Sequence, residues 1–122
     1  MTADESIFAR LMAVVEDRKR NPPAKSYTTQ LMAGGIDAIS AKVLEESREV
    51  IEAAKEEENG GHDHLVRETA DLIYHLFVLL GYCDVRLAEV EAELASRFGM
   101  SGLEEKASRP GAAAEKPLDQ MP

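Results

Sequence analysis

Two long segments of helical periodicity, separated by a glycine break, constrain the fold more than any other feature of the chain. Apolar residues recur at helical spacing from about residue 36 to residue 58, and again from about residue 63 to residue 82, where Asp63 is the expected N-cap. The pair Gly60-Gly61 stands between the two segments and ends the first of them. Because so short a connection makes successive helices antiparallel neighbours, we expect a helical hairpin.

The apolar positions of these segments indicate which faces are buried. The stripe of the first segment consists of Ile36, Ile39, Val43, Val50 and Ala54. The main face of the second consists of Leu65, Leu72, Leu76 and Leu79, widened by Ile73, Phe77, Val78 and Leu80. Since the second segment is apolar almost all round, we expect it to lie at the centre of the fold or in a subunit interface, and we expect a homodimer.

Shorter helices are expected on both sides of the hairpin. An amphipathic helix from about residue 3 to residue 20 ends at an Asn-Pro-Pro sequence, and a short helix over residues 28–32 ends at two glycines. A last helix is expected from about residue 86 to residue 98. The chain is therefore predicted to be all-α with four main helices. Residues 1–103 form one domain and residues 104–122 a flexible polar tail with little to bury.

Charge and composition narrow the classes of function. Fourteen basic and 23 acidic residues give a net charge of -9, which disfavours nucleic acid and anionic membranes as partners because both repel an acidic chain. The first residues lack the apolar core of a signal peptide, and the longest apolar stretch, Leu76 to Leu80, is too short to span a membrane. We therefore expect a soluble cytoplasmic protein. Its single cysteine, Cys83, is expected to be a small buried filler.

Carboxylates are concentrated on both long segments. The first carries the sequence Glu45-Glu46-x-x-Glu49, and the second carries Glu68-x-x-Asp71. Residues three apart lie about 60° apart around a helix, so Glu46 and Glu49 share one edge beside the apolar stripe. Glu68 and Asp71 share an edge in the same way, whereas Glu45 points roughly away from its stripe.

A hairpin packed through its apolar stripes brings the two acidic edges to one rim. Like charges about 4 Å apart cost roughly 4 kcal/mol per pair at an effective dielectric constant of 20, so such a cluster must either bind protons or recruit cations. Hard oxygen donors select Mg²⁺, with Mn²⁺ as a substitute. Either pair alone is typical of a solvated helix face, but two pairs that border the apolar stripes favour a metal site. His75, near Asp71, is either a hydrogen-bonded structural residue or a ligand or proton relay.

The acidic motif on a helical hairpin resembles that of the all-α nucleoside triphosphate pyrophosphatase superfamily, which includes MazG-type enzymes. Its surroundings resemble more specifically the phosphoribosyl-ATP pyrophosphatase family. The residues that carry this narrower resemblance are Arg18-Lys19, Asn21-Pro22-Pro23, Ser26-Tyr27-Thr28, Leu31, Gly35, Ile39, Lys42-Val43 and Ala70 to Leu76. The chain departs from the family pattern at Gly34, Leu44 and Ser47, and none of these departures removes a carboxylate.

The resemblance, which covers roughly residues 5 to 98, implies both a reaction and a set of site residues. The reaction is the Mg²⁺-dependent hydrolysis of phosphoribosyl-ATP to phosphoribosyl-AMP and pyrophosphate in histidine biosynthesis. The implied metal ligands are Glu46, Glu49, Glu68 and Asp71, with Glu45 as an auxiliary, and the catalytic base is Glu46 or Glu49. The phosphates of such a substrate need cationic contacts, for which the candidates are Arg18, Lys19, Lys25 and Lys42, and hydroxyl contacts, for which the candidates are Ser26, Tyr27 and Thr28. His75 is expected to support the ligands without itself binding the metal.

Two other functions remain open on the sequence alone. A MazG-type pyrophosphatase that removes canonical or damaged nucleotides shares the fold, metal and reaction type, although the segment from Arg18 to Thr28 argues against it. A helical module without catalytic activity uses its apolar faces only for oligomerisation. Arg18 and Lys19 are then ordinary solubilising charges, and Tyr27 is a packing residue.

Overall fold

The computed structural model of the 122-residue chain describes residues 6–56, 60–98, 106–107 and 109. The regular secondary structure of these residues is entirely helical, which confirms the predicted all-α class. None of the helices they form combines the length and the apolar character needed to cross a membrane. The chain divides into two compact units, residues 1–87 and 88–122. Most of the predicted tail lies outside the described residues and stays a prediction.

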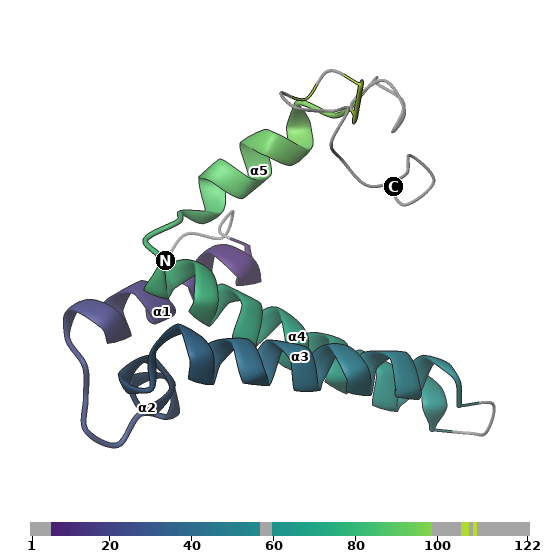
Figure 1. The fold of residues 1–122 in the computed structure, drawn as a ribbon, viewed down its shortest axis with the longest axis horizontal. Coiled ribbons are helices and arrows are strands. Elements are labelled where there is room, and N and C mark those ends of the chain that lie inside the picture. The colour runs from purple at the N-terminus through teal and green to yellow at the C-terminus, as the bar shows by residue number, and fades with distance from the viewer. Residues whose placement is uncertain (1–5, 57–59, 99–105, 108, 110–122) are drawn as a thin grey trace. The chain divides into compact units, whose positions relative to one another are not determined.

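The first unit is built around the expected hairpin. Its helices are α1 (Ile7–Arg20), α2 (Tyr27–Ala33), α3 (Gly35–Ala54) and α4 (Gly61–Tyr82). Helices α3 and α4 run antiparallel and lie side by side, and α1 packs on α4 (Figure 1). The short helix α2 contacts the other three. The hairpin therefore provides the frame on which both the core and the acidic residues are placed.

Serine side chains cap the N-termini of the first two helices. Ser6 Oγ accepts a hydrogen bond from the Ala9 N–H at 3.1 Å, and Ser26 Oγ accepts one from the Thr29 N–H at 3.2 Å. The predicted cap of α4 was wrong, because Gly60 occupies the N-cap position with a φ of 101°. Asp63 lies in the first turn instead, where its negative charge complements the helix dipole.

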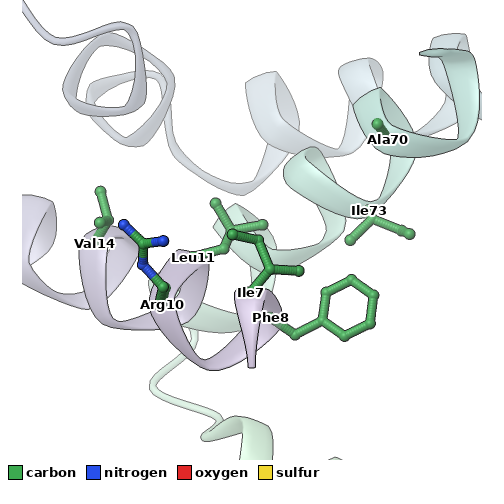
Figure 2. A pocket seen from close by; sticks show the side chains of 7 residues that line it. All are labelled: Ile7, Phe8, Arg10, Leu11, Val14, Ala70 and Ile73. Carbon is green, nitrogen blue, oxygen red and sulfur yellow. The ribbon is translucent and has the colours of Figure 1, made fainter. Parts of the chain in front are cut away.

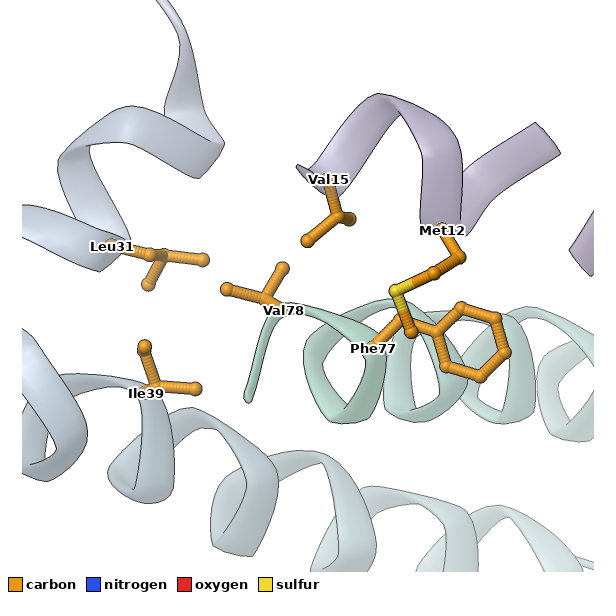
Figure 3. Packing of buried hydrophobic residues seen from close by; sticks show 6 residues of the cluster. All are labelled: Met12, Val15, Leu31, Ile39, Phe77 and Val78. Carbon is orange, nitrogen blue, oxygen red and sulfur yellow. The ribbon is translucent and has the colours of Figure 1, made fainter. Parts of the chain in front are cut away.

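The core lies where α1 and α2 meet the hairpin. Its buried apolar residues are Met12 and Val15 of α1, Leu31 of α2, Ile39 of α3, and Phe77 and Val78 of α4 (Figure 3). Three residues of the predicted faces are exposed, namely Ile36 (50%), Leu76 (40%) and Ala54. Helix α4 packs against both α3 and α1. Its most buried residues are therefore those that face the space between these two helices, and they differ from the predicted stripe of leucines.

One glycine permits the close approach of α1 to α4. Gly81, in the last turn of α4, is buried, and a Cβ atom at this position would lie 2.4 Å from Val15 Cγ1. Val15 is itself fully buried and β-branched, so its side chain has little freedom to move aside. Gly81 is therefore required by packing and not by backbone conformation.

Cys83 is exposed, so the prediction of a buried filler was wrong. It follows the last residue of α4, where the chain leaves the packed helix for the surface. In the second unit, α5 (Leu87–Ala95) is shorter than predicted and contains no buried residue.

Candidate functional site

Acidic side chains from both arms of the hairpin converge as predicted. Glu46 of α3 and Glu68 and Asp71 of α4 each contribute a carboxylate oxygen, and these three oxygens lie within 4.8 Å of one another. Glu49, one turn further along α3, is close enough to Glu68 for each carboxyl group to shift the pKa of the other. Glu46 is only 6% exposed and the Glu68 side chain 15%, whereas Asp71 is exposed. The cluster is thus buried on one side and open on the other.

Two carboxyl groups of this site, those of Glu46 and Glu49, hold protons more tightly than isolated ones. Burial, followed by the charge of Glu49 and a hydrogen bond with Glu68, raises the pKa of Glu46 from 4.5 to about 7. The hydrogen bond to Glu68 also raises the pKa of Glu49, and the same bond lowers the pKa of Glu68. The protonation of Glu46, Glu49 and Glu68 is therefore interdependent, with Glu46 the group whose pKa is raised to about 7.

Two oxygens of this cluster lack any donor. The Oε2 atoms of Glu46 and Glu68 are buried and have no hydrogen-bond partner within the described residues. A buried acceptor without a partner costs free energy, so native structures seldom retain one without a reason. A hard cation between the two helices would satisfy both oxygens, and its charge would remove the repulsion among the carboxylates. The donor set therefore fits a metal ion.

Lys42 and Glu45 form a pair beside this cluster. Lys42 Nζ lies 2.5 Å from Glu45 Oε2 and 3.9 Å from Glu46 Oε1. The hydrogen bond with Glu45 raises the pKa of Lys42 and lowers that of Glu45. Glu45 is not part of the three-carboxylate group, consistent with its expected direction away from the apolar stripe.

Polar contacts connect the start of α2 to α4 next to Asp71. The His75 Nδ1–H donates to the Asp71 carbonyl oxygen at 2.8 Å, which leaves His75 Nε2 to accept from the Tyr27 hydroxyl at 3.2 Å. His75 is 5% exposed, so its two hydrogen bonds satisfy a buried ring. Thr28 is buried, and its hydroxyl is hydrogen-bonded to the Tyr74 hydroxyl. The structure thus brings Tyr27 and His75 close to the acidic cluster and places Thr28 in the packing between helices.

The remaining predicted substrate residues lie elsewhere. Arg18 pairs with Asp17 at 3.2 Å, and Lys19 Nζ lies 2.8 Å from both the Tyr82 carbonyl oxygen and Asp84 Oδ1. Since α4 rises about 1.5 Å per residue, roughly 16 Å of helix separates Asp71 from the end of α4. The structure does not bring Arg18 and Lys19 together with the carboxylates, and Ser26 caps α2.

One residue beside the cluster was missed from the sequence. His64 Nδ1 lies 2.8 Å from Glu56 Oε1, and His64 Nε2 lies 3.4 Å from Glu68 Oε1. The spacing of four residues between His64 and Glu68 was visible in the sequence, and it places both on the same helix face. The contact with Glu56 depended on where α3 ends.

Comparison with known proteins settles the family. A family model described as phosphoribosyl-ATP pyrophosphohydrolase matches residues 8–98. The chain belongs to this family. The match includes every residue of the acidic cluster, and the predicted class of enzyme, a hydrolase that releases pyrophosphate, is confirmed with it.

Individual relatives agree with the family match. The chain is 52% identical over 101 residues to a phosphoribosyl-ATP pyrophosphatase of Rhodopirellula baltica, a match that covers 83% of this chain and 84% of the relative. It is 47% identical over 106 residues to that of Geotalea daltonii, covering 87% and 97%, and 41% identical over 119 residues to that of Nitrosospira multiformis, covering 98% and 96%. These relatives correspond to this chain over nearly their whole lengths.

Proposed function

We propose that this chain hydrolyses phosphoribosyl-ATP to phosphoribosyl-AMP and pyrophosphate, the second step of histidine biosynthesis, at a magnesium site formed by the α3–α4 hairpin. The observation that carries the proposal is the convergence of buried carboxylates with two oxygens that lack donors. Family membership supports the substrate and the dependence on metal. The predicted cytoplasmic location suits this reaction, because the nucleotide substrate and Mg²⁺ are both found there.

Glu46, Glu68 and Asp71 would hold the cation. Oxygen-only ligands favour Mg²⁺ or Mn²⁺ over metals that prefer nitrogen or sulfur. When bound, Mg²⁺ supplies positive charge that neutralises phosphate oxygens and makes a coordinated water more acidic. Because Asp71 is exposed whereas Glu46 is buried, the open side of the cluster is the side from which the phosphates approach.

We assign Glu49 as the general base that accepts a proton from the attacking water. It lies outside the three-carboxylate group but contacts Glu68, and its raised pKa makes it a better base than an ordinary carboxylate. Water attacks the α-phosphorus in line with the bridging oxygen, the bond to the β-phosphate breaks, and pyrophosphate leaves. Glu49 takes one proton from the water, and the other remains on the phosphoryl product. Glu46, the other candidate base, is better suited to holding the cation because it is buried.

Two sets of side chains are proposed to position the substrate. Lys42, 3.9 Å from Glu46, and Tyr27, which is hydrogen-bonded to His75, would bind the phosphate chain. Lys19 of α1 is bonded to the end of α4, roughly 16 Å of helix from Asp71, and Lys19 and its neighbour Arg18 would bind the ribose 5-phosphate at the opposite end of the substrate. An extended phosphoribosyl-ATP places a ribose, a purine and a second ribose between its reacting phosphorus and that phosphate, which is a comparable length. Ser26 and Thr28 support the Tyr27 segment by capping and packing.

A panel of substrates tests the function. We expect kcat/KM for phosphoribosyl-ATP to exceed that for dATP, dCTP and dUTP by roughly 100-fold or more, because only the first substrate has a group for the distant cations. Steady-state assays in Mg²⁺ and in Mn²⁺ measure this ratio. A preference for any deoxynucleotide would favour the MazG-type alternative, and hydrolysis of none of the four substrates, phosphoribosyl-ATP included, would favour the non-catalytic helical module.

We also propose that the chain forms a homodimer through α1 and α4. Exposed apolar side chains of α1 and α4 line a hollow of about 430 Å³ (Figure 2). Its apolar lining residues are Ile7, Phe8, Leu11, Val14, Ala70 and Ile73. Ile7 is 65% exposed and Phe8 and Val14 are 45% exposed, which is unusual for neighbouring large apolar residues on a monomer surface. A second copy is the occupant that buries this surface symmetrically.

Charged substitutions test the dimer. The Phe8→Asp and Val14→Asp double variant is expected to sediment as a 13.4 kDa monomer at micromolar concentration, whereas the unmodified protein sediments as a dimer. Leu44→Asp is the matched control, since Leu44 is 68% exposed but lies on α3 and does not line the hollow. A monomeric unmodified protein, or a control that dissociates equally, would contradict the proposed interface.

A further inference from the structure

We infer that His64 is a positioning residue that holds the Glu68 carboxylate in the orientation required for cation binding. The inference rests on the proposed metal site, and nothing in the family resemblance assigns a role to this histidine. His64 lies in the first turns of α4, one turn before Glu68. Its ring connects Glu68 to Glu56, which follows the end of α3.

The two ring contacts differ in strength and purpose. The His64 Nδ1 to Glu56 Oε1 distance of 2.8 Å is a full hydrogen bond, and it fixes the plane of the imidazole. The His64 Nε2 to Glu68 Oε1 distance of 3.4 Å is a longer contact, and the two carboxylates are both attracted only by a ring that carries a proton on each nitrogen. Glu56 therefore anchors the ring, and the ring in turn restricts Glu68.

Glu68 is the ligand that most needs such restriction. Its carboxyl group interacts with Glu46 and Glu49 on α3 as well as with His64, so it has several competing orientations. Contact of Oε1 with His64 leaves Oε2, the buried oxygen without a donor, available to a cation. Partners outside a metal's direct ligands orient those ligands, and losing one such partner typically weakens metal affinity 10- to 100-fold.

The same geometry also connects the turn of the hairpin to the cluster. Glu56 and His64 lie on either side of the Gly60-Gly61 break, so their hydrogen bond closes the hairpin at its turn. A shift of the α3 end relative to α4 would move His64 and thereby Glu68. His64 does not need to contact the substrate or the cation in order to act in this way.

Calorimetric titration with MnCl₂ alone, without substrate, tests the inference. His64→Ala is expected to weaken Mn²⁺ affinity 10- to 100-fold, and His64→Gln, which keeps a donor for Glu68, is expected to recover most of that loss. Glu56→Gln is expected to cause a smaller loss, because Glu68 keeps its histidine partner. His62→Ala is the matched control, since His62 lies on the same turn and is exposed.

The outcomes separate this inference from the proposed function. If His64→Ala binds Mn²⁺ within twofold of the unmodified protein while Glu68→Gln loses binding, the positioning role is refuted and the metal site stands. Tighter binding in both His64 variants would also refute the role, because it would show that the ring opposes the cation by its charge. If Glu68→Gln binds Mn²⁺ normally, the metal site itself is refuted. Circular dichroism establishes that each variant is folded, and if His64→Ala is not, Glu56→Gln with His64→Gln decides the question.

Discussion

Replacing Glu46 by glutamine is expected to lower kcat/KM for phosphoribosyl-ATP by roughly 10³-fold, because the charge stabilisation that a catalytic cation supplies amounts to several kcal/mol. Glu46 is the most buried of the clustered carboxylates, and one of its oxygens lacks a donor. Glutamine keeps the shape but removes the charge that binds the cation. Steady-state kinetics measure the loss of kcat/KM, and calorimetric titration with Mg²⁺ measures the loss of cation affinity.

The same variant is expected to be more stable than the unmodified protein when metal is absent. Since the pKa of Glu46 is raised from 4.5 to about 7, its contribution to stability is fully present below about pH 4.5 and is lost as the pH rises through 7. At pH 8 this lowers the free energy of unfolding by about 3 kcal/mol. Glutamine avoids this loss, and its amide can donate to the orphan oxygen of Glu68. Thermal unfolding at pH 8 in EDTA, compared with pH 5, measures the difference.

Metal binding should follow the same titration. Below pH 7 the cation must displace the proton of Glu46, so Mn²⁺ affinity is expected to fall about tenfold per pH unit. Glu52→Gln is the control, because Glu52 is an exposed carboxylate on the same helix. Full activity in Glu46→Gln, or an equal loss in Glu52→Gln, would contradict the proposed metal site.

Introducing a side chain at Gly81 is expected to cause the largest loss of stability. Gly81→Leu forces atoms into the space of Val15, which a Cβ atom alone would approach to 2.4 Å. Overpacking of this kind costs about 3 kcal/mol, and the better helix propensity of leucine offsets only about 1 kcal/mol. We therefore expect a net loss of about 2 kcal/mol and a fall in Tm of roughly 10 °C.

A double variant separates this packing effect from other causes. Adding Val15→Ala removes the methyl groups that clash, so part of the stability lost in Gly81→Leu should return even though Val15→Ala alone is destabilising. Ala54→Leu places the same leucine side chain at an exposed helix position and should change stability by less than about 0.5 kcal/mol. A Gly81→Leu protein as stable as the Ala54→Leu protein would show that α1 and α4 do not pack as described.

The sequence predicted the hairpin and the convergence of its acidic residues because both depend on local periodicity. Glu46 and Glu68 were placed on facing edges by helix geometry alone, and the structure brings them together as expected. The buried line of α4 was predicted less well. Leu76 is partly exposed and Val78 is buried, because that choice depends on α1, whose contact with α4 is distant in sequence.

Contacts between elements explain the other differences. Periodicity gave no indication that Lys19 would be held by Tyr82 and Asp84, or that Thr28 would bond to Tyr74. His64 was overlooked because its partner Glu56 lies beyond the end of α3, where the path of the chain is not set by helical spacing. Cys83 was misplaced for a related reason, since an apolar run continues past the point where the helix leaves the packed interior.

The apolar core and the acidic cluster occupy different stretches of the hairpin, and this separation affects how the protein would open. Ile39 and Val78 hold the two helices together near α1 and α2, whereas Glu46 and Glu68 repel one another nearer the turn. Backbone amides of α3 and α4 beside the acidic cluster should therefore exchange with solvent through local opening, while those of the core stay protected. Under the proposed function, a cation bound between α3 and α4 would remove the repulsion and protect the amides beside the cluster. The cation needed for catalysis would then also stabilise the less stable part of the hairpin.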